Sequence, residues 1–211
     1  MKIYDNRATV TFSRIEPNKT VLYLGCVGMG KDDVIGGCDN IFGRLDKSLA
    51  IGLDINPDGV KELNDLGYHA KVQDLNYEYD LKKKFDYVVT EENIEHISNL
   101  RTYLEMAKKH LKKDGKLLVT TPNANCAEFF LQYLLWGRLR VNLFHTHLHS
   151  RETITYLLNS NGFEIEEYEV FQAVNSEATN LSGKMVKLFW RLLPNKFGRT
   201  IFIKAKVQND N

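Results

Sequence analysis

The sequence has few cysteines and no long apolar run. Its three cysteines, Cys26, Cys38 and Cys126, form no Cys-x-x-Cys pair, which favours reduced thiols in a cytoplasmic protein over a disulfide framework. The apolar stretch Phe129–Trp136 is interrupted by Gln132 and falls far short of the roughly 20 residues of a membrane span. The first 20 residues lack an apolar h-region, so we expect no secretory signal and a soluble, cytoplasmic protein.

The sequence also lacks a strong charge of either sign. It contains 28 basic and 27 acidic residues, a formal net charge of +1. Because the charges balance, the protein as a whole has no positive field that would attract nucleic acid or an anionic membrane. The length of 211 residues and the hydrophobic content of 43% suit one globular domain.

Short apolar runs alternate in the first part of the chain with segments of helical pattern. Apolar residues stand at consecutive positions in most of the runs, as in strands buried on both faces of a sheet. This alternation is typical of a parallel sheet covered by helices. The expected strands are Val21–Leu24, Leu49–Leu53, His69–Val72, Phe85–Val89 and Lys116–Thr121, and the expected helices are Asp58–Leu66 and Leu100–Leu111, the second ending at Lys112-Lys113-Asp114-Gly115.

The second part of the chain changes character. Ser150 is suited to cap a helix that ends at Asn161-Gly162. The expected elements are a helix over Glu128–Trp136, an irregular stretch over Gly137–His149, a helix from Ser150 to Asn159, strands over Phe163–Phe171 and Thr200–Val207, and between these strands a long connection, Gln172–Arg199, that contains the amphipathic segment Lys184–Leu193. We therefore predict one α/β domain over residues 1–211 with seven strands.

Ligand-binding groups follow four of the predicted strands. The first runs into the glycine-rich turn Gly25-Cys26-Val27-Gly28-Met29-Gly30, where the backbone can approach a ligand closely. Asp54 ends the second strand and can accept both hydroxyls of a ribose. Asp74 and Leu75 follow the third strand, and Thr90 and Glu91 follow the fourth. In open α/β sheets such groups converge on one crevice at the carboxyl ends of the strands.

The segment FDYVVTEENIEHISNLRTYLEMAKKHLKKDGKLLVTTPN, residues 85–123, is the most specific part of a wider resemblance. From about Lys19 to Gly162 the chain resembles the class I S-adenosylmethionine-dependent methyltransferases, especially their ubiquinone O-methyltransferase-like branch and relatives among polysaccharide and small-molecule tailoring enzymes. The resemblance implies a Rossmann-like, mostly parallel sheet with an antiparallel terminal strand and helices on both faces. It also implies a cofactor half of about residues 1–123 and an acceptor or lid half of about residues 124–211.

The resemblance assigns the cofactor, S-adenosyl-L-methionine, to particular residues. It implies contacts with the methionine moiety by Gly25, Cys26, Val27 and Gly28, with the ribose by Asp54, with the adenine by Ile55, Asp74 and Leu75, and with the sulfonium region by Thr90 and Glu91. Two positions depart from the family pattern. An acidic residue is usual where Tyr23 stands, and a second glycine is usual where Val27 stands. The first departure leaves open how the amino group of the cofactor is anchored.

A nicotinamide cofactor is the competing interpretation of the glycine turn. A dehydrogenase favours the spacing G-x-G-x-x-G, whereas these glycines are spaced G-x-x-G-x-G. The Tyr-x-x-x-Lys sequence at Tyr79–Lys83 precedes the fourth strand and is poorly placed for hydride chemistry. We therefore favour the methyltransferase.

Histidines are the candidate catalytic bases, because a hydroxyl acceptor benefits from a group that removes its proton. On an extended chain His145, His147 and His149 share one face. We expect His147 to be the base, with His96 and His145 as the other candidates. Three imidazoles on one face could instead hold Zn²⁺ or Fe²⁺, but no carboxylate stands nearby in the sequence, so we predict no metal site.

The expected function is O-methylation of a small-molecule or glycan-type acceptor. The aromatic and basic segments Phe129–Arg140 and Lys184–Arg191 suit either helices that pack on the sheet or a lid for an apolar or lipid-linked acceptor at a membrane surface. An RNA- or protein-directed methyltransferase and a non-catalytic cofactor-binding partner subunit are the alternatives. Against RNA, the net charge is near zero and no basic domain is appended.

Overall fold

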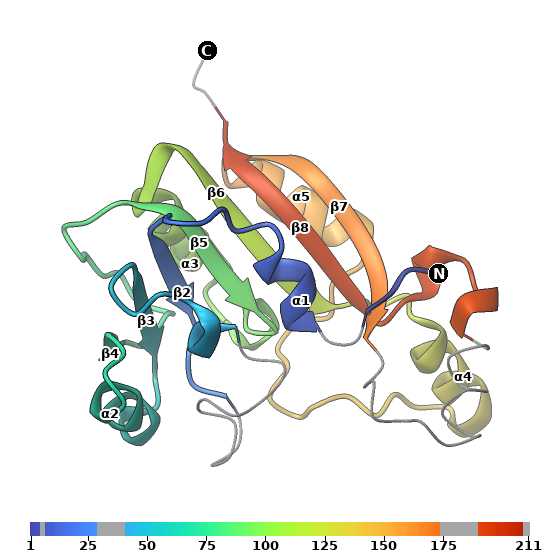
Figure 1. Cartoon of the computed structure of the whole chain (residues 1–211). Helices are drawn as coiled ribbons and strands as arrows, with labels where there is room; N and C mark the ends of the chain where they lie inside the picture. The colour runs from blue at the N-terminus through green and yellow to red at the C-terminus, as the bar shows by residue number, and fades with distance from the viewer. Residues whose placement is uncertain (5–6, 29–40, 174–189, 209–211) are drawn as a thin grey trace.

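The chain folds around one mixed β-sheet, as a computed structural model shows. The structure describes residues 1–4, 7–28, 41–173 and 190–208. Within these residues the sheet has eight strands in the order β1-β7-β8-β6-β5-β2-β3-β4 (Figure 1). Their bounds are β1 Ile3–Tyr4, β2 Val21–Leu24, β3 Ala50–Asp54, β4 Ala70–Val72, β5 Phe85–Glu91, β6 Leu111–Pro122, β7 Phe163–Ala173 and β8 Thr200–Val207.

The strand directions confirm the predicted Rossmann-like architecture. Strands β2 to β6 pair in parallel, whereas β8 runs antiparallel to both of its neighbours, β6 and β7. The structure adds an eighth strand, β1, which pairs in parallel with the end of β7. Two residues are too few to show a strand pattern, so β1 could not be predicted from the sequence.

Helices cover both faces of the sheet. One core contains side chains of α1 (Arg7–Phe12), α2 (Pro57–Asp65) and the 3₁₀ turn η1 (Phe42–Arg44). The core on the other face contains side chains of α3 (Leu100–Lys109) and α5 (Arg151–Ser160). Figure 1 shows α1 in front of the sheet and α3 and α5 behind it. The remaining elements are η2 (Ile94–His96), α4 (Ala127–Trp136) and η3 (Asn195–Phe197).

Local sequence sets the ends of three helices. Asn56 accepts hydrogen bonds from the N–H groups of Asp58 and Gly59 at the start of α2, and Pro57 opens the helix. Ser150 caps α5 as predicted, in a capping box with Thr153. Gly137 ends α4 in the left-handed region, with φ 63°, which a glycine adopts without strain.

The boundary between α3 and β6 differs from the prediction. The helix ends at Lys109 with His110 as its C-cap, and β6 begins at Leu111 instead of Lys116. The reason is pairing with a distant strand: Leu111 lies opposite Phe85, whose N–H donates to the carbonyl of His110 at 2.8 Å. Of the expected amphipathic segment Lys184–Leu193, residues 184–189 lie outside the described residues.

Candidate active site

The glycine turn begins directly after β2. Gly25 has φ +77°, and a Cβ at this position would overlap the side-chain amide of Asn93, so only glycine fits. Val27 occupies space that a side chain at Gly59 would need, so the glycine in α2 accommodates the valine that replaces the usual glycine of the turn. Gly28 is half-buried, while Met29 and Gly30 lie outside the described residues.

Asp54, at the end of β3, connects this turn with α2. Its carboxylate accepts the N–H of Val27 at 2.8 Å and the N–H of Asn56 at 2.9 Å. The residue is 8% exposed, and burial raises its pKa while the two backbone N–H groups act in the opposite direction. Cys26 is fully buried and packs against Gly52 of β3, and burial raises the pKa of its thiol, which is therefore neutral.

Three predicted adenine contacts follow β3 and β4. Ile55 is 62% exposed, although isoleucine is among the residues most often buried, whereas Leu75 is buried. Asp74 is half-buried, and its Oδ1 accepts the N–H and the side-chain amide of Asn76, both at 2.9 Å. Ile55 therefore offers an open apolar face next to polar groups.

The end of β5 contributes two further residues. Thr90 is buried, and its hydroxyl accepts a hydrogen bond of 2.6 Å from Tyr103 in α3, so the side chain is directed at the helix. Glu91 accepts a hydrogen bond of 2.7 Å from the hydroxyl of Tyr23, and its other oxygen is buried without a hydrogen-bond partner among the described residues.

These predicted residues lie at one edge of the sheet, because β5, β2, β3 and β4 are consecutive neighbours. A glycine turn after a strand, a carboxylate at a strand end and a buried carboxylate oxygen without a close donor among the described residues fit a nucleoside that has a charged amino-acid tail.

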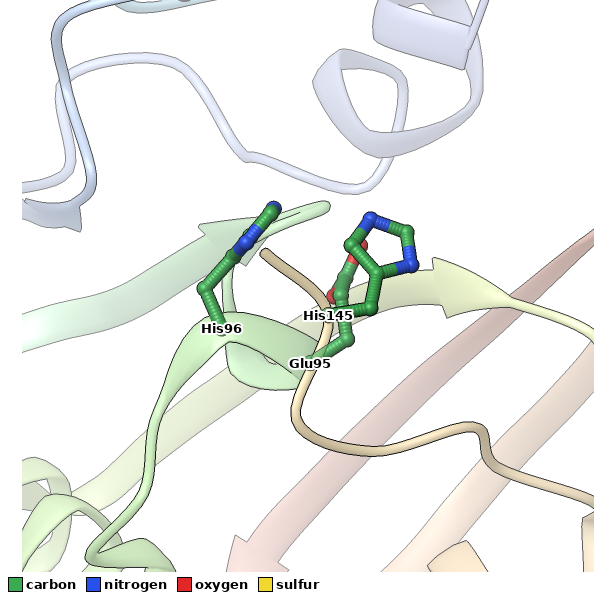
Figure 2. A group of neighbouring side chains, drawn as sticks. All are labelled: Glu95, His96 and His145. Atoms are coloured by element: carbon green, nitrogen blue, oxygen red, sulfur yellow. The ribbon is translucent and has the colours of Figure 1, made fainter. Parts of the chain in front are cut away.

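Glu95, His96 and His145 form a second group next to this edge. One oxygen or nitrogen atom from each lies within 4.8 Å of the others, and the rings of His96 and His145 are 4.7 Å apart, edge to face. Figure 2 shows Glu95 and His96 projecting from η2 and His145 from the loop that follows α4. Two imidazoles and a carboxylate could hold a divalent cation. The metal set weighed from the sequence, His145 with His147 and His149, is not the one that the structure brings together.

The three histidines of the His145-Thr-His147-Leu-His149 segment do not line one face. His145 contacts His96, whereas His147 stacks on His149 with 5.9 Å between the ring centres. The chain bends at Thr146, because the N–H groups of Thr146 and His147 both donate to the carbonyl of Glu95, at 2.8 and 3.2 Å. The expectation of a shared face assumed an extended segment and is wrong.

Burial controls the charge of these groups. It lowers the pKa of His145, and the neighbouring His96 lowers it further, so the imidazole of His145 is neutral near pH 7. His149 is 5% exposed, and burial together with His147 lowers its pKa to about 4. Glu95 is 1% exposed, and burial followed by the charge of Glu92 raises its pKa well above the usual range.

A cavity of about 470 Å³ opens at the carboxyl ends of β5 to β7 and the start of β8. His96 and His145 lie in its wall; His147 and His149 are not among the described residues that line it. Glu92, which the sequence also offered as a candidate base, lines it as well, whereas sequence reasoning missed several other lining residues: Arg7, Glu95, Gln172 and Arg199. Arg7 and Gln172 come from segments far from the recognised motifs, while Glu95 stands inside the Glu-His turn and could have been found there.

A second cavity, of about 670 Å³, lies between α4, α5, β7 and η3. Aromatic and apolar side chains make up much of its wall, among them Phe129, Phe130, Tyr133, Tyr168 and Phe197. Beside it, α4 exposes apolar side chains to solvent: Phe130, Tyr133, Leu134 and Leu135 are each 65–67% exposed. Within the described part of the chain, no helix combines the length and apolar character that crossing a membrane requires.

Comparisons with known proteins agree with this geometry. Residues 10–168, more than half of the chain, match the family model of a methyltransferase domain. The chain is 27% identical over 137 residues to the ubiquinone biosynthesis O-methyltransferase of Pelagibacter ubique, covering 57% of this chain and 52% of that protein. It is 26% identical over 162 residues to the mitochondrial ubiquinone biosynthesis O-methyltransferase of Bos taurus, covering 69% of this chain and 41% of that protein. The chain thus spans about half the length of these curated relatives.

Solved structures show the same fold. A crystal structure of an S-adenosylmethionine-dependent methyltransferase from Mesorhizobium loti superposes with a TM-score of 0.62 at 13% identity, over 93% of this chain and 95% of that one. The Tyr79–Lys83 sequence, by contrast, does not form a dehydrogenase site, because Tyr79 is buried and stacks on His110. The chain therefore belongs to the class I S-adenosylmethionine-dependent methyltransferases.

Proposed function

We propose that the protein transfers a methyl group to a hydroxyl of a small-molecule or glycan-type acceptor, free or lipid-linked. The observation that carries this proposal is the position of His145 and His96 in the wall of the cavity at the carboxyl ends of β5 to β7. A hydroxyl is a weak nucleophile until its proton is removed, and a neutral imidazole is the side chain suited to remove it near pH 7.

Residues 1–123 hold the cofactor in this proposal, and residues 124–211 provide most of the acceptor site. Gly25, Cys26, Val27 and Gly28 receive the methionine moiety, Asp54 the ribose, Ile55, Asp74 and Leu75 the adenine, and Thr90 and Glu91 the sulfonium region. When bound, the cofactor supplies a methyl group on a positively charged sulfur.

His145 is the base that we now prefer over His147. Its Nδ1 is buried without a hydrogen-bond partner among the described residues, and its lowered pKa keeps it ready to accept a proton. The buried carboxyl of Glu95 lies next to it, held by the hydroxyl of Thr121 at 3.1 Å. Together with the cavity wall, these residues orient the acceptor; such positioning can supply about 7–11 kcal/mol of the barrier.

The apolar cavity beside α4 supports an acceptor with an apolar part. Its aromatic wall suits a hydrocarbon or ring system, and the exposed apolar face of α4 is suited to lie at the surface of a membrane that contains a lipid-linked acceptor. Arg138 and Arg140 follow the helix and are exposed, as expected next to anionic lipid headgroups.

Transfer of a labelled methyl group to a panel of catechols, alkyl-substituted catechols and hydroxyl-bearing glycans tests the proposal. We expect His145→Ala to lower kcat by about 100-fold or more, the usual contribution of a general base, while the affinity for S-adenosylhomocysteine stays unchanged. Only neutral His145 accepts the proton, so wild-type activity should fall when the pH drops through the pKa of this imidazole, which lies below the usual pKa of histidine. His145→Ala should lose this pH dependence.

Parallel variants separate the alternatives. A selective loss in His147→Ala or His96→Ala would move the base to that residue. Activity that chelation abolishes and zinc restores would assign Glu95, His96 and His145 to a metal instead. Cofactor binding without turnover on this panel would favour RNA or protein acceptors or a non-catalytic partner role, and binding to RNA that weakens steeply with salt would select the RNA acceptor.

A further inference from the structure

The pair Tyr23–Glu91 joins two neighbouring strands beside the glycine turn. Tyr23, in β2, is 3% exposed, and its hydroxyl donates to Oε2 of Glu91, at the end of β5, at 2.7 Å. Tyr23 stands where the sequence resemblance expects an acidic residue. The structure therefore has a carboxylate in this region after all, but the carboxylate comes from the adjacent strand.

The register of the sheet places this carboxylate next to the turn. Leu24 of β2 lies opposite Thr90 of β5, so Gly25 and Glu91 are the next residues along two parallel strands about 4.8 Å apart. Tyr23 lies opposite Val89, and Val89 and Glu91 point to the same face of the sheet because side chains alternate. Glu91 thus lies on the same face as Tyr23, one strand away from the turn at Gly25, with Thr11 and Arg7 of α1 as further neighbours.

One oxygen of Glu91 lacks a close hydrogen-bond donor within the described part of the chain. Oε1 is buried, while Oε2 is held by Tyr23. Burial raises the pKa of this carboxyl, and the hydroxyl of Thr11, the hydrogen bond from Tyr23 and the positive charge of Arg7 counteract the effect of burial. The guanidinium of Arg7 bonds to Glu92 at 2.9 Å. A buried acceptor without a donor is costly unless a ligand supplies one.

We propose that Glu91, positioned by Tyr23, binds the α-ammonium group of the methionine moiety of the cofactor, beyond the sulfonium region to which the resemblance assigns it. A primary ammonium has three donors and a positive charge, so it satisfies the unpaired oxygen and neutralises the buried carboxylate. Tyr23 is a positioning residue, because it fixes the carboxylate and does not itself face the ammonium. The proposal rests on the placement of the cofactor at Gly25–Gly28 given above.

Calorimetry with three ligands tests the proposal without any methyl acceptor. S-adenosylhomocysteine and its decarboxylated analogue both have the ammonium group, whereas 5′-methylthioadenosine lacks the whole amino-acid end. We expect Glu91→Gln to weaken binding of the first two about 10- to 100-fold, the range for a hydrogen bond to a charged group, and to leave methylthioadenosine within about twofold of wild type. Tyr23→Phe should show the same selectivity with a smaller loss, about 3- to 10-fold.

Tyr87→Phe is the matched control. Tyr87 is a buried tyrosine in β5, the strand of Glu91, but it lies nearer the opposite end of that strand. Its hydroxyl bonds to Glu16 at 3.3 Å, so the affinities for all three ligands should be unchanged. If Glu91→Gln does not fold, the selectivity of Tyr23→Phe decides. An equal loss for all three ligands in either variant, or no loss for S-adenosylhomocysteine, would overturn the role of Glu91. A wild-type protein that binds none of the three would overturn the cofactor site as well.

Discussion

At the scale of single residues, both the shape of the glycine turn and the proposed ribose contact depend on Asp54. Each of its carboxylate oxygens accepts one backbone N–H, from Val27 and from Asn56. A carboxylate oxygen accepts two hydrogen bonds, so each oxygen can still receive one hydroxyl. Asp74 differs, because its Oδ1 already accepts two hydrogen bonds from Asn76.

We therefore expect Asp54→Ala to weaken the binding of S-adenosylhomocysteine by about 1.5–3 kcal/mol. Asp74→Ala should cost less, about 0.5–1.5 kcal/mol, because a single neutral amino donor of adenine is lost. Titration calorimetry on both variants and on wild type gives the comparison. Because methylthioadenosine keeps the ribose, Asp54→Ala should weaken its binding too, unlike Glu91→Gln. A larger loss at Asp74 than at Asp54 would mean that the two roles are reversed.

At the scale of elements, the start of α5 could be predicted from its capping residue, whereas the end of α3 depends on strand pairing. Ser150 is the N-cap of α5, and its side chain accepts the N–H of Thr153 at 3.3 Å while the Thr153 hydroxyl accepts the N–H of Ser150 at 2.8 Å. The helix buries Ile154 and Leu158 against the sheet. His149, the last residue of the His145–His149 segment, directly precedes the cap.

Ser150→Ala should lower the free energy of unfolding by about 1 kcal/mol, because an N–H of the first turn loses its acceptor. Urea unfolding followed by circular dichroism measures the change. Ser160→Ala, at the other end of α5, removes a hydroxyl that bonds only within its own helix, to the carbonyls of Tyr156 and Leu157, and should change stability by less than half as much. Equal effects of the two substitutions would contradict the capping role.

Seven of the strands, and the position of the glycine turn and the aspartates at strand ends, could be predicted because those features depend on local patterns. Apolar runs mark buried strands, and glycine and aspartate at strand ends mark the crevice. The histidine cluster could not be predicted, because its geometry depends on a hydrogen bond between segments about 50 residues apart. The carbonyl of Glu95 bends the chain at Thr146, which turns His145 toward His96 and removes His147 from the cavity wall. The Tyr23–Glu91 pair likewise depends on strand pairing and not on spacing.

At the scale of the whole molecule, the order of the strands separates two tasks. The ends of β5, β2, β3 and β4 form the proposed cofactor edge, and the ends of β5, β6 and β7 with the start of β8 form the proposed acceptor cavity. Both regions include residues at the end of β5 or just after it, so the proposed methyl donor and the proposed acceptor meet there. On the side of the proposed acceptor cavity, α4 and the loop after it expose apolar side chains.

The last prediction concerns this apolar surface. If α4 lies at a membrane, wild-type protein should co-sediment with vesicles of phosphatidylcholine that contain phosphatidylglycerol, because apolar side chains insert while the exposed Arg138, Arg140 and Lys196 meet anionic headgroups. Replacing both Leu134 and Leu135 with serine should lower the partition coefficient at least about tenfold, since each leucine removed from water contributes about 1.5 kcal/mol or more.

Leu66 and Val72 provide the matched control. They are 47% and 54% exposed, comparable to the two leucines of α4, but they lie at the end of α2 and in β4, in the cofactor half. Their double replacement with serine should leave vesicle binding unchanged, because the basic residues Lys47 and Lys71 lie next to them without the row of exposed apolar side chains that α4 has. Equal losses in both double variants would mean that binding reflects general hydrophobicity. If the wild-type protein does not bind vesicles, the apolar face of α4 can contact only the acceptor itself. The KM for the alkyl-substituted catechols then tests this contact: it should rise in the double variant of Leu134 and Leu135 and stay unchanged in the double variant of Leu66 and Val72.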